Sequence, residues 1–532
     1  MKIAGVYSSH DCAFAILEDG IPTVHAELER YLRVKEPVGD AFKFLTEEYK
    51  DYKDIKYYSH TIDTYKGGPM AWYPDSWQEM IRLSSANGGK VVMPGHHKSH
   101  AANAFFSSNH EDALIITLDG GGRDVWDGQI IPTAFTVWEG RGNKIKDVAI
   151  LHEEQVNVGI YWAEFTEEVF GLSRGYPKGN QCGTVMAMAC MGNPDKYHDY
   201  ILNHQFKRTP GWPMPNYKHL KQIAEQSEQN AFDIAAGLQK ATETFVRKLL
   251  EPFVKKSKSK NLCLSGGVVL NSVMVGKMRE EWYKDRFDNI YVCPVPYDSG
   301  LAIGSAQYVW HHHLENPRIK WEDNATPYLG FIYEKQAVMN AIESNTLKVT
   351  HSETTDKDVA LLLDKGKIVS VFGGGSESGR RALGNRSILA DPRNPNMKDI
   401  INEKVKHRQW YRPFAPSILR ESVKDWFYSD ISSPYMSFVL KFKEEVRSRV
   451  PAVVHFDGSA RLQTVTERDN KWYYNFIKTW EATSGVPILL NTSFNDREPI
   501  VETPEHAIAC FLKTDIDYLY FTDYGILVSK RS

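Results

Sequence analysis

The chain contains 532 residues, of which 42% are hydrophobic and 25% are charged, and its formal net charge is −3. A chain of this length is expected to form two or more domains, and the composition is typical of a soluble globular enzyme. The near-neutral charge excludes a strong overall attraction to nucleic acid or anionic lipid, and the sequence lacks an apolar run long enough to span a membrane.

The cysteines and the first residues of the chain indicate the cellular compartment in which the protein is expected. The six cysteines are scattered without a C-x-x-C pair, which predicts reduced thiols instead of a disulfide framework or a zinc ribbon. The chain starts directly with a strand-like segment, Lys2–Tyr7, and not with a basic and then apolar leader. We therefore expect a cytoplasmic protein that is not anchored to a membrane.

The first 30 residues predict three short strands around a polar loop. The strands are expected at 3–7, 13–17 and 21–28, with the loop at 8–11 and a turn at 18–20. A similar order returns as a strand at 113–118, a glycine-rich polar loop at 119–127 and a strand at 131–138. Such an internal repeat is typical of the actin/Hsp70/sugar-kinase ATPase fold, although two hairpins can also resemble each other by chance.

Two histidines one helical turn apart, His96 and His100, precede Asp119 at the mouth of the glycine loop. On a helix both rings face the same side and can bind one metal ion, and backbone N–H groups around Gly120 and Gly121 can hold phosphate. Histidines at this spacing are more often surface or core residues. The sequence argues against a zincin metallopeptidase, because position 97 is His where such enzymes have Glu as general base.

A second glycine segment follows a long predicted helix. Apolar residues at helical spacing over 234–249 indicate the helix, which is expected to end at Pro252. The apolar segment after it runs into Gly266 and Gly267, just before Asn271. This arrangement predicts a further phosphate loop.

Asp298 precedes another glycine turn that opens a helix. It either caps that helix or supplies one more carboxylate ligand. Two histidines and two carboxylates suit Fe(II), Mn(II) or Zn(II) better than Mg(II) alone.

After residue 345 the sequence predicts a second α/β region that is rich in cations. A helix is expected at 356–367, a strand at 368–372 and a glycine loop at 373–379. Arginines and lysines then cluster between residues 380 and 412 and are interleaved with apolar residues and prolines. This pattern favours an anion-binding pocket over ordinary solvated charge, because a buried arginine needs an anionic partner.

These segments together resemble the carbamoyltransferase family that includes nodulation protein U and the cephem and tobramycin O-carbamoyltransferases. The resemblance covers nearly the whole chain and keeps the family's order. It is carried by Ser9-His10-Asp11, Glu29-Arg30, His96-x-x-x-His100, Leu118-Asp119-Gly120, Gly266-Gly267-Val268 with Asn271, Asp298-x-Gly300, the RALGNRSILADPR string from Arg381 to Arg393, Lys404-x-Lys406-x-Arg408, Arg412–Pro416 and Leu490–Asn495.

The resemblance implies a division of labour between two domains. Residues 1–350 would form the duplicated ATPase-fold domain, and residues 351–532 a YrdC-like α/β domain. The C-terminal domain would convert carbamoyl phosphate and ATP, with its Mg²⁺, into carbamoyl-adenylate. The N-terminal domain would then pass the carbamoyl group to an acceptor hydroxyl and release AMP, in a monomer or a homodimer.

The family's functional positions transfer to this chain residue by residue. Those for carbamoyl phosphate are Arg381, Lys406, Arg412 and Arg461, of which Lys406 and Arg412 would also take part in catalysis. Those for the nucleotide are Asp119, Gly120, Gly121, Gly266, Gly267, Asn271, Asn495 and Arg497. Those for the metal, with Fe(II) as the first expectation, are His96, His100, Asp119 and Asp298. His10 would be the general base for the acceptor hydroxyl, or would only orient Asp11 or the phosphate loop.

The sequence also departs from the family, and it leaves the acceptor open. The family commonly has E-G-K-x-M-G-L-A where residues 182–189 read CGTVMAMA, so no contact is carried over there. We favour a hydroxyl of a small sugar- or antibiotic-type molecule. The alternative is a 5-hydroxymethyl pyrimidine in viral DNA, for which aromatic loops at 65–73 and 212–217 would stack on bases. A non-catalytic ATP-binding sensor is a third hypothesis, which the complete set of cations argues against.

Overall fold

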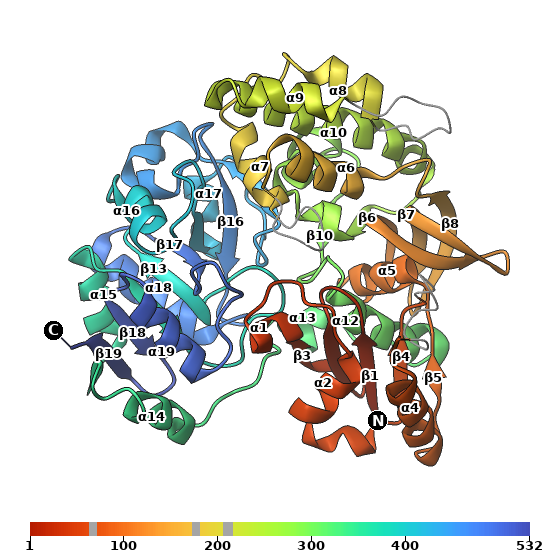
Figure 1. Cartoon of the computed structure of the whole chain (residues 1–532), viewed down its shortest axis with the longest axis horizontal. Coiled ribbons are helices and arrows are strands. Elements are labelled where there is room, and N and C mark those ends of the chain that lie inside the picture. The colour runs from red at the N-terminus through yellow and green to blue at the C-terminus, as the bar shows by residue number, and fades with distance from the viewer. Residues whose placement is uncertain (63–71, 173–180, 206–215, 532) are drawn as a thin grey trace. The chain divides into compact units, whose positions relative to one another are not determined.

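The computed structural model describes residues 1–62, 72–172, 181–205 and 216–531, which form two compact units. The first unit consists of residues 1–29 and 36–326, and the second of residues 30–35 and 327–532. The short segment 30–35 therefore belongs to the second unit, although the chain on both sides of it belongs to the first. Figure 1 colours the chain by residue number.

Two five-stranded sheets in the first unit share one topology. Their strand orders are β3-β2-β1-β4-β5 and β8-β7-β6-β9-β10. In each sheet the third strand, β1 or β6, pairs antiparallel with its hairpin partner and parallel with the strand on its other side. The strands are β1 (Lys2–Tyr7), β2 (Ala13–Glu18), β3 (Ile21–Glu27), β4 (Tyr57–His60), β5 (Val91–Val92), β6 (Asp112–Trp126), β7 (Gln129–Arg141), β8 (Lys144–His152), β9 (Asn261–Ser265) and β10 (Asn289–Val292). The predicted internal repeat is confirmed, and the first unit has the duplicated fold of the actin/Hsp70/sugar-kinase class.

Two helices join these sheets. Helix α12 (Gly300–Gln307) packs on β1, β2 and β4, helix α5 (His96–Phe106) packs on β6, β7 and β9, and the two helices pack on each other. Glycines allow the close approach: a Cβ at Gly304 would lie 2.0 Å from Ser99 O, and one at Gly5 would lie 1.8 Å from Ala302 O. The end of β1, the middle of β6 and the starts of α5 and α12 therefore lie close together.

The glycine-rich segment after Leu118 differs from the predicted loop. Strand β6 continues to Trp126 and pairs with β7 on both sides of a register shift between Leu118 and Gly122. The residues between them form a bulge, with Gly121 at φ 151°. The prediction of a loop over 119–127 is wrong, because a bulge lets the strand carry the polar residues without leaving the sheet.

The long helix α10 (Glu228–Lys256) packs against α7 (Cys182–Ala189), α8 (His198–Gln205) and α9 (Tyr217–Ala224) (Figure 1). The helix is confirmed, but the prediction that it ends at Pro252 is wrong. Near the end of a helix a proline removes only one backbone hydrogen bond, and the buried side chains on either side of it keep the last turns packed. Further helices of the first unit are α2 (Ala41–Glu48), α4 (Pro74–Ala86), α6 (Val158–Glu164), α11 (Ser272–Lys277) and α13 (Trp321–Asn324), and α1 (Leu28–Leu32) enters the segment 30–35.

The second unit contains a nine-stranded mixed sheet in the order β11-β19-β18-β12-β13-β17-β14-β16-β15. Its strands are β11 (Val349–Glu353), β12 (Val369–Phe372), β13 (Arg386–Ala390), β14 (Ala415–Leu419), β15 (Phe438–Lys441), β16 (Ser459–Val465), β17 (Ile488–Ser493), β18 (Tyr518–Phe521) and β19 (Ile526–Lys530). Its helices are α14 (Lys335–Glu343), α15 (Asp356–Asp364), α16 (Met397–Lys404), α17 (Val423–Trp426), α18 (Lys471–Ser484) and α19 (Pro504–Lys513). The helix and strand expected around residues 356–372 are α15 and β12. The α/β class is confirmed, and the YrdC-like assignment stays an expectation.

Two further observations concern the cysteines and the length and polarity of the helices. All six cysteines are free thiols, as the sequence predicts. Within the described part of the chain, every helix is too short or too polar to cross a membrane.

Candidate metal and anion sites

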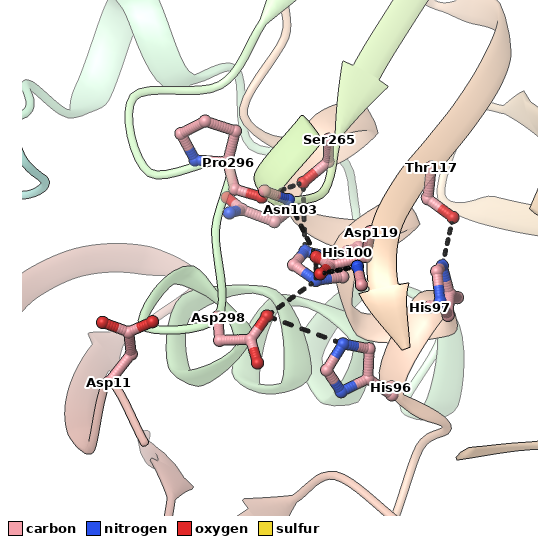
Figure 2. A network of polar contacts seen from close by, with 12 residues as sticks. Asp11, His96, His97, His100, Asn103, Thr117, Asp119, Ser265, Pro296 and Asp298 are labelled. Carbon is pink, nitrogen blue, oxygen red and sulfur yellow. Dashed lines mark hydrogen bonds and ion pairs between the residues drawn. The ribbon is translucent and has the colours of Figure 1, made fainter. Parts of the chain in front are cut away.

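Four side chains of the first unit converge as the sequence predicts. His96 and His100 extend from one face of α5, Asp119 lies in the bulge of β6, and Asp298 lies just before α12 (Figure 2). One ligand atom from each of the four lies within 4.8 Å of the others, and all but Asp119 are buried. Asp298 makes no cap for α12, whose N-cap residue is Ser299. Of the two roles considered for Asp298, its position among these side chains is compatible with that of a ligand, which stays a prediction.

The two imidazoles point their Nε2 atoms at the carboxylates. His100 Nε2 lies 3.0 Å from Asp119 Oδ2 and 3.4 Å from Asp298 Oδ1, and His96 Nε2 lies 3.6 Å from Asp298 Oδ1. Both Nε2 atoms are buried without a hydrogen-bond partner of acceptable geometry among the described residues. Two orphaned imidazole nitrogens that face two carboxylates fit a divalent cation, which would accept all four lone pairs.

The outer contacts of His100 suit the same role. Ser265 Oγ lies 3.2 Å from His100 Nδ1 and 3.2 Å from Pro296 O. A protonated Nδ1 of His100 can therefore donate a hydrogen bond to Ser265 Oγ, and the Ser265 hydroxyl in turn donates to Pro296 O. This relay leaves the Nε2 lone pair of His100 for a ligand.

Without a bound cation, protons on the histidines balance the negative charges of Asp119 and Asp298. Burial lowers the pKa of His100, but Asp119 and Asp298 outweigh burial and raise it to about 9. Burial raises the pKa of Asp298, but the surrounding histidines bring it well below its usual range. The two carboxylates thus stay charged in a buried place, where each needs a proton or a cation close by.

His10 and Tyr7 complete the surroundings of Asp298. Tyr7 Oη donates to Asp298 Oδ2 at 2.8 Å, and His10 Nε2 lies 3.5 Å from the same oxygen. His10 Nδ1 lies 3.3 Å from Asp11 Oδ2. Burial lowers the pKa of His10, but Asp11 and Asp298 outweigh burial and raise it to about 9. The structure therefore places His10 beside both residues, and sequence reasoning missed Tyr7, which lies at the end of an ordinary apolar strand.

The glycine segments lie against Asp119. Gly267 N donates to Asp119 Oδ2 at 2.8 Å, and Gly120 N lies 2.5 Å from Asp119 Oδ1. Gly266 has φ 97°, and a Cβ there would lie 2.0 Å from Leu118 O, so only glycine fits. Asn271 is held by Gln239 and caps α11 through Met274 N. The structure brings this group of predicted nucleotide residues together, and their contact with a nucleotide stays a prediction.

The second unit gathers the predicted cations. Burial lowers the pKa of Arg461, and Arg381 and Arg412 lower it further. Burial likewise lowers the pKa of Arg408, with Arg412 and Arg461 next in effect. Arg461 Nε is buried without a hydrogen-bond partner in the part of the chain that the structure describes. These mutually repelling guanidinium groups, which we call the cation cluster (Arg381, Arg408, Arg412 and Arg461), have the electrostatics of an anion site.

Lys406 is buried beside the cation cluster but is already bound. Its Nζ donates to Ser493 O at 2.5 Å, Asn495 O at 2.8 Å and Asn495 Oδ1 at 2.6 Å. Burial lowers the pKa of Lys406, and Arg408 lowers it further. An anion that contacts Lys406 must exchange with one of these oxygens.

Asn495 and Arg497 differ in their surroundings. Asn495 is buried and ties Lys406 to Glu498 O. Arg497 is exposed and donates to His407 O at 3.0 Å. Their predicted contacts with a nucleotide stay predictions. The DNA alternative rests on the loops 65–73 and 212–217, of which residues 65–71 and 212–215 lie outside the described residues, and contact of these loops with DNA stays a prediction.

Comparisons with known proteins agree on one family. Residues 73–307 match the model of the carbamoyltransferase N-terminus and residues 360–528 that of the carbamoyltransferase C-terminus. Nodulation protein NolO of Bradyrhizobium diazoefficiens is 33% identical over 82% of this chain and 79% of its own length. The 3'-hydroxymethylcephem-O-carbamoyltransferase of Amycolatopsis lactamdurans is 28% identical over 74% of each chain. The solved structure of T. kodakarensis HypF has a TM-score of 0.38 at 15% identity and covers 59% of this chain and 48% of its own, a likeness too distant to argue from. With both family regions matched in order, the chain belongs to the carbamoyltransferase family.

Proposed function

We propose that this enzyme is an ATP-dependent O-carbamoyltransferase that uses carbamoyl phosphate and forms carbamoyl-adenylate. Carbamoyl phosphate and water give carbamate and phosphate, and carbamate attacks the α-phosphorus of ATP and displaces pyrophosphate. The acceptor hydroxyl then attacks the carbamoyl carbon, and AMP leaves. The observation that carries the proposal is the presence, in one chain of this family, of a partly buried cation cluster in the second unit and a His₂Asp₂ site in the first.

The cation cluster supports the activation half. Carbamoyl phosphate is small and dianionic, and several guanidinium groups around it would neutralise its charge and fix its orientation. Arg412 lies close enough to Arg461 to lower the pKa of that group, and the pKa of Arg412 itself is lowered by burial. A bound dianion would relieve this repulsion.

The His₂Asp₂ site supports the transfer half. His96, His100, Asp119 and Asp298 would hold a divalent cation, with Fe(II), Mn(II) and Zn(II) as candidates from the donor set. Such a cation supplies positive charge that polarises the transferring carbamoyl group and the adenylate phosphate. Gly120 and Gly267 would donate backbone N–H groups to the same phosphate in exchange for the hydrogen bonds that they donate to Asp119 here.

His10 is the proposed general base for the acceptor hydroxyl. It is the partly exposed histidine at this site, and it is oriented by Asp11 on one side and Asp298 on the other. The role requires a neutral ring, which neutralisation of Asp298 by a bound cation would favour.

Pyrophosphate release tests the activation half. The protein is incubated with ATP and carbamoyl phosphate, and the rate is compared between the wild type, Arg412→Gln and Lys424→Gln. Lys424 is exposed on α17 and serves as the matched charge-removal control. Loss of one charged hydrogen bond lowers kcat/KM for carbamoyl phosphate by about 10- to 100-fold in Arg412→Gln, and Lys424→Gln keeps the wild-type value. Absence of pyrophosphate release by the wild type would refute the proposal.

The acceptor is proposed to be a hydroxyl of a small molecule. The relative from Amycolatopsis lactamdurans is named for a hydroxymethyl group on a cephem, and it matches three quarters of this chain. Formation of a carbamate ester is followed by mass spectrometry with a panel of hydroxylated sugars and antibiotic scaffolds. A DNA oligonucleotide with 5-hydroxymethyl cytosine is the counter-arm. Carbamoylation of the oligonucleotide alone would overturn the small-molecule assignment and leave the chemistry intact.

A further inference from the structure

Asp124 is a fully buried carboxylate that lies next to the metal-ligand helix without being one of the ligands. It lies on β6, and its side chain accepts from the first turn of α5: His97 N donates to Oδ2 at 3.0 Å, and Lys98 N donates to Oδ1 at 3.0 Å. Thr133 Oγ1, on β7, donates to Oδ2 at 3.1 Å. A side chain from a neighbouring sheet therefore caps this helix.

The helix has no cap of its own. Its N-cap residue, Gly95, offers no side chain, and a Cβ at that position would lie 2.1 Å from Asp124 Oδ1. The glycine is thus explained by the carboxylate that takes over the capping. A negative charge at this end also complements the helix dipole.

The opposite end of α5 carries the opposite charge. Arg318 donates to Phe105 O at 2.5 Å and to Ser108 O at 2.9 Å, and its guanidinium lies over the Phe105 ring. A buried anion at the first turn and a partly buried cation at the last turn hold the helix along its own axis. The position of α5 is therefore fixed by charges from outside the helix.

The contact of Asp124 joins the two elements that carry three of the four candidate ligands. His96 and His100 lie on α5, and Asp119 lies five residues before Asp124 on β6. A Cβ at Gly122, between the two acids, would lie 2.4 Å from the His96 ring. A shift of α5 along β6 would change the separation of His100 Nε2 and Asp119 Oδ2, which is 3.0 Å here.

We propose that Asp124 is a positioning residue of the metal site, which sets the distance between the imidazoles of α5 and the carboxylate of Asp119. The inference rests on the proposed metal site. Asp124 touches neither the cation nor the substrate, and acts through the helix. It therefore controls how tightly, and in which geometry, the four ligands bind a cation.

Titration of the full-length, metal-stripped protein with Co(II) tests the inference, because the visible spectrum of Co(II) reports ligand geometry separately from affinity. The variant is Asp124→Asn, which keeps the size of the side chain but turns one acceptor into a donor against a backbone N–H. The matched control is Asp233→Asn. Asp233 is also buried in the first unit and accepts from Asn193 N at 2.9 Å, but it lies on α10.

We expect Asp124→Asn to bind Co(II) about 10- to 100-fold more weakly than the wild type, with a changed spectrum, the usual effect of losing an outer-shell partner. Asp233→Asn should keep the wild-type affinity and spectrum even where it lowers the unfolding temperature. Should Asp124→Asn fail to fold, Thr133→Val removes one hydrogen bond to the same carboxylate at constant shape and should give a smaller shift in the same direction.

Three results would overturn the inference. Wild-type affinity and spectrum in a folded Asp124→Asn would refute the positioning role alone, as would an unchanged Co(II) titration in Thr133→Val where Asp124→Asn does not fold. A wild-type protein that binds no Co(II) would refute the metal site and this inference together. Activity is not needed for any of these readouts, so failure of the carbamoyl-transfer proposal is detected separately by the absence of pyrophosphate release.

Discussion

Replacement of Arg461 by methionine should make the free protein more stable and the anion-bound protein less so. Arg461 is largely buried, its Nε has no hydrogen-bond partner among the described residues, and the neighbours that act on its pKa are the cations Arg381 and Arg412. Methionine keeps the length of the side chain without the charge. Removal of a buried, repelled charge in favour of an apolar side chain is expected to stabilise the free protein by about 1 kcal/mol or more.

A bound anion should make the wild type more stable than Arg461→Met. Loss of one charged hydrogen bond costs about 1.5–3 kcal/mol, which raises the Kd for the anion by about 10- to 100-fold. At an anion concentration of about 100 times the wild-type Kd, binding stabilises the wild type by about 2.7 kcal/mol and the variant by only about 0.4–1.4 kcal/mol. The two opposing effects should make the stabilities cross or converge as anion is added.

Urea unfolding of the full-length chain with and without inorganic phosphate, and again with carbamoyl phosphate, measures both effects. Lys424→Met is the control for loss of an exposed cation and should change neither the stability nor the response to phosphate. The reasoning is refuted if Arg461→Met is less stable than the wild type without ligand and gains as much stability from phosphate. That pair of results would mean that Arg461 already has an internal anionic partner.

Three further predictions concern other parts of the chain. Burial lowers the pKa of His311 to about 3, so the stabilising contribution of the neutral ring is complete above pH 6.5 and is lost as the pH falls from 6.5 toward 3. In urea unfolding, His311→Phe should therefore remove about 2 kcal/mol of the difference in stability between pH 8 and pH 5. An unchanged difference would contradict this prediction. Arg30 forms a buried ion pair with Glu502 at 3.6 Å. Arg30→Met should therefore destabilise the second unit by about 3–5 kcal/mol, and the double variant with Glu502→Gln should recover part of this loss of stability. Fully additive effects of the two substitutions on stability would argue against a coupled pair. Removal of divalent cations with a chelator should lower the unfolding temperature of the wild type but not that of His100→Asn, as followed by calorimetry, and an equal fall in both would place the effect elsewhere.

Local patterns predicted part of the His₂Asp₂ site. The spacing of His96 and His100 by one helical turn predicts that both rings share a face, and α5 confirms it. The convergence of Asp119 and Asp298 on those rings does not follow from spacing, because Asp298 reaches them only through the packing of α12 on α5. The resemblance to a family supplied that link, and the structure agrees with it.

Other features depended on contacts between distant segments. The bulge after Leu118 could not be told from a loop because glycine-rich polar residues favour both. Asp124 carries no local signal at all: it has the appearance of a polar residue near a turn, and its partners on α5 lie more than 25 positions earlier. Arg30 likewise is an unremarkable charge in the sequence, yet it is buried and donates to Gly379 O at 2.6 Å in the second unit.

The two candidate sites share a physical condition although their charges are opposite. In the first unit, Asp119 and Asp298 raise the pKa of the buried His100 to about 9. In the second unit, partly buried guanidinium groups repel one another. Each arrangement costs stability in the free chain, and a ligand of opposite charge would reduce that cost. Residues that serve stability alone would not be kept so close together, so the cost itself is an argument that a cation and an anion are bound at these two places.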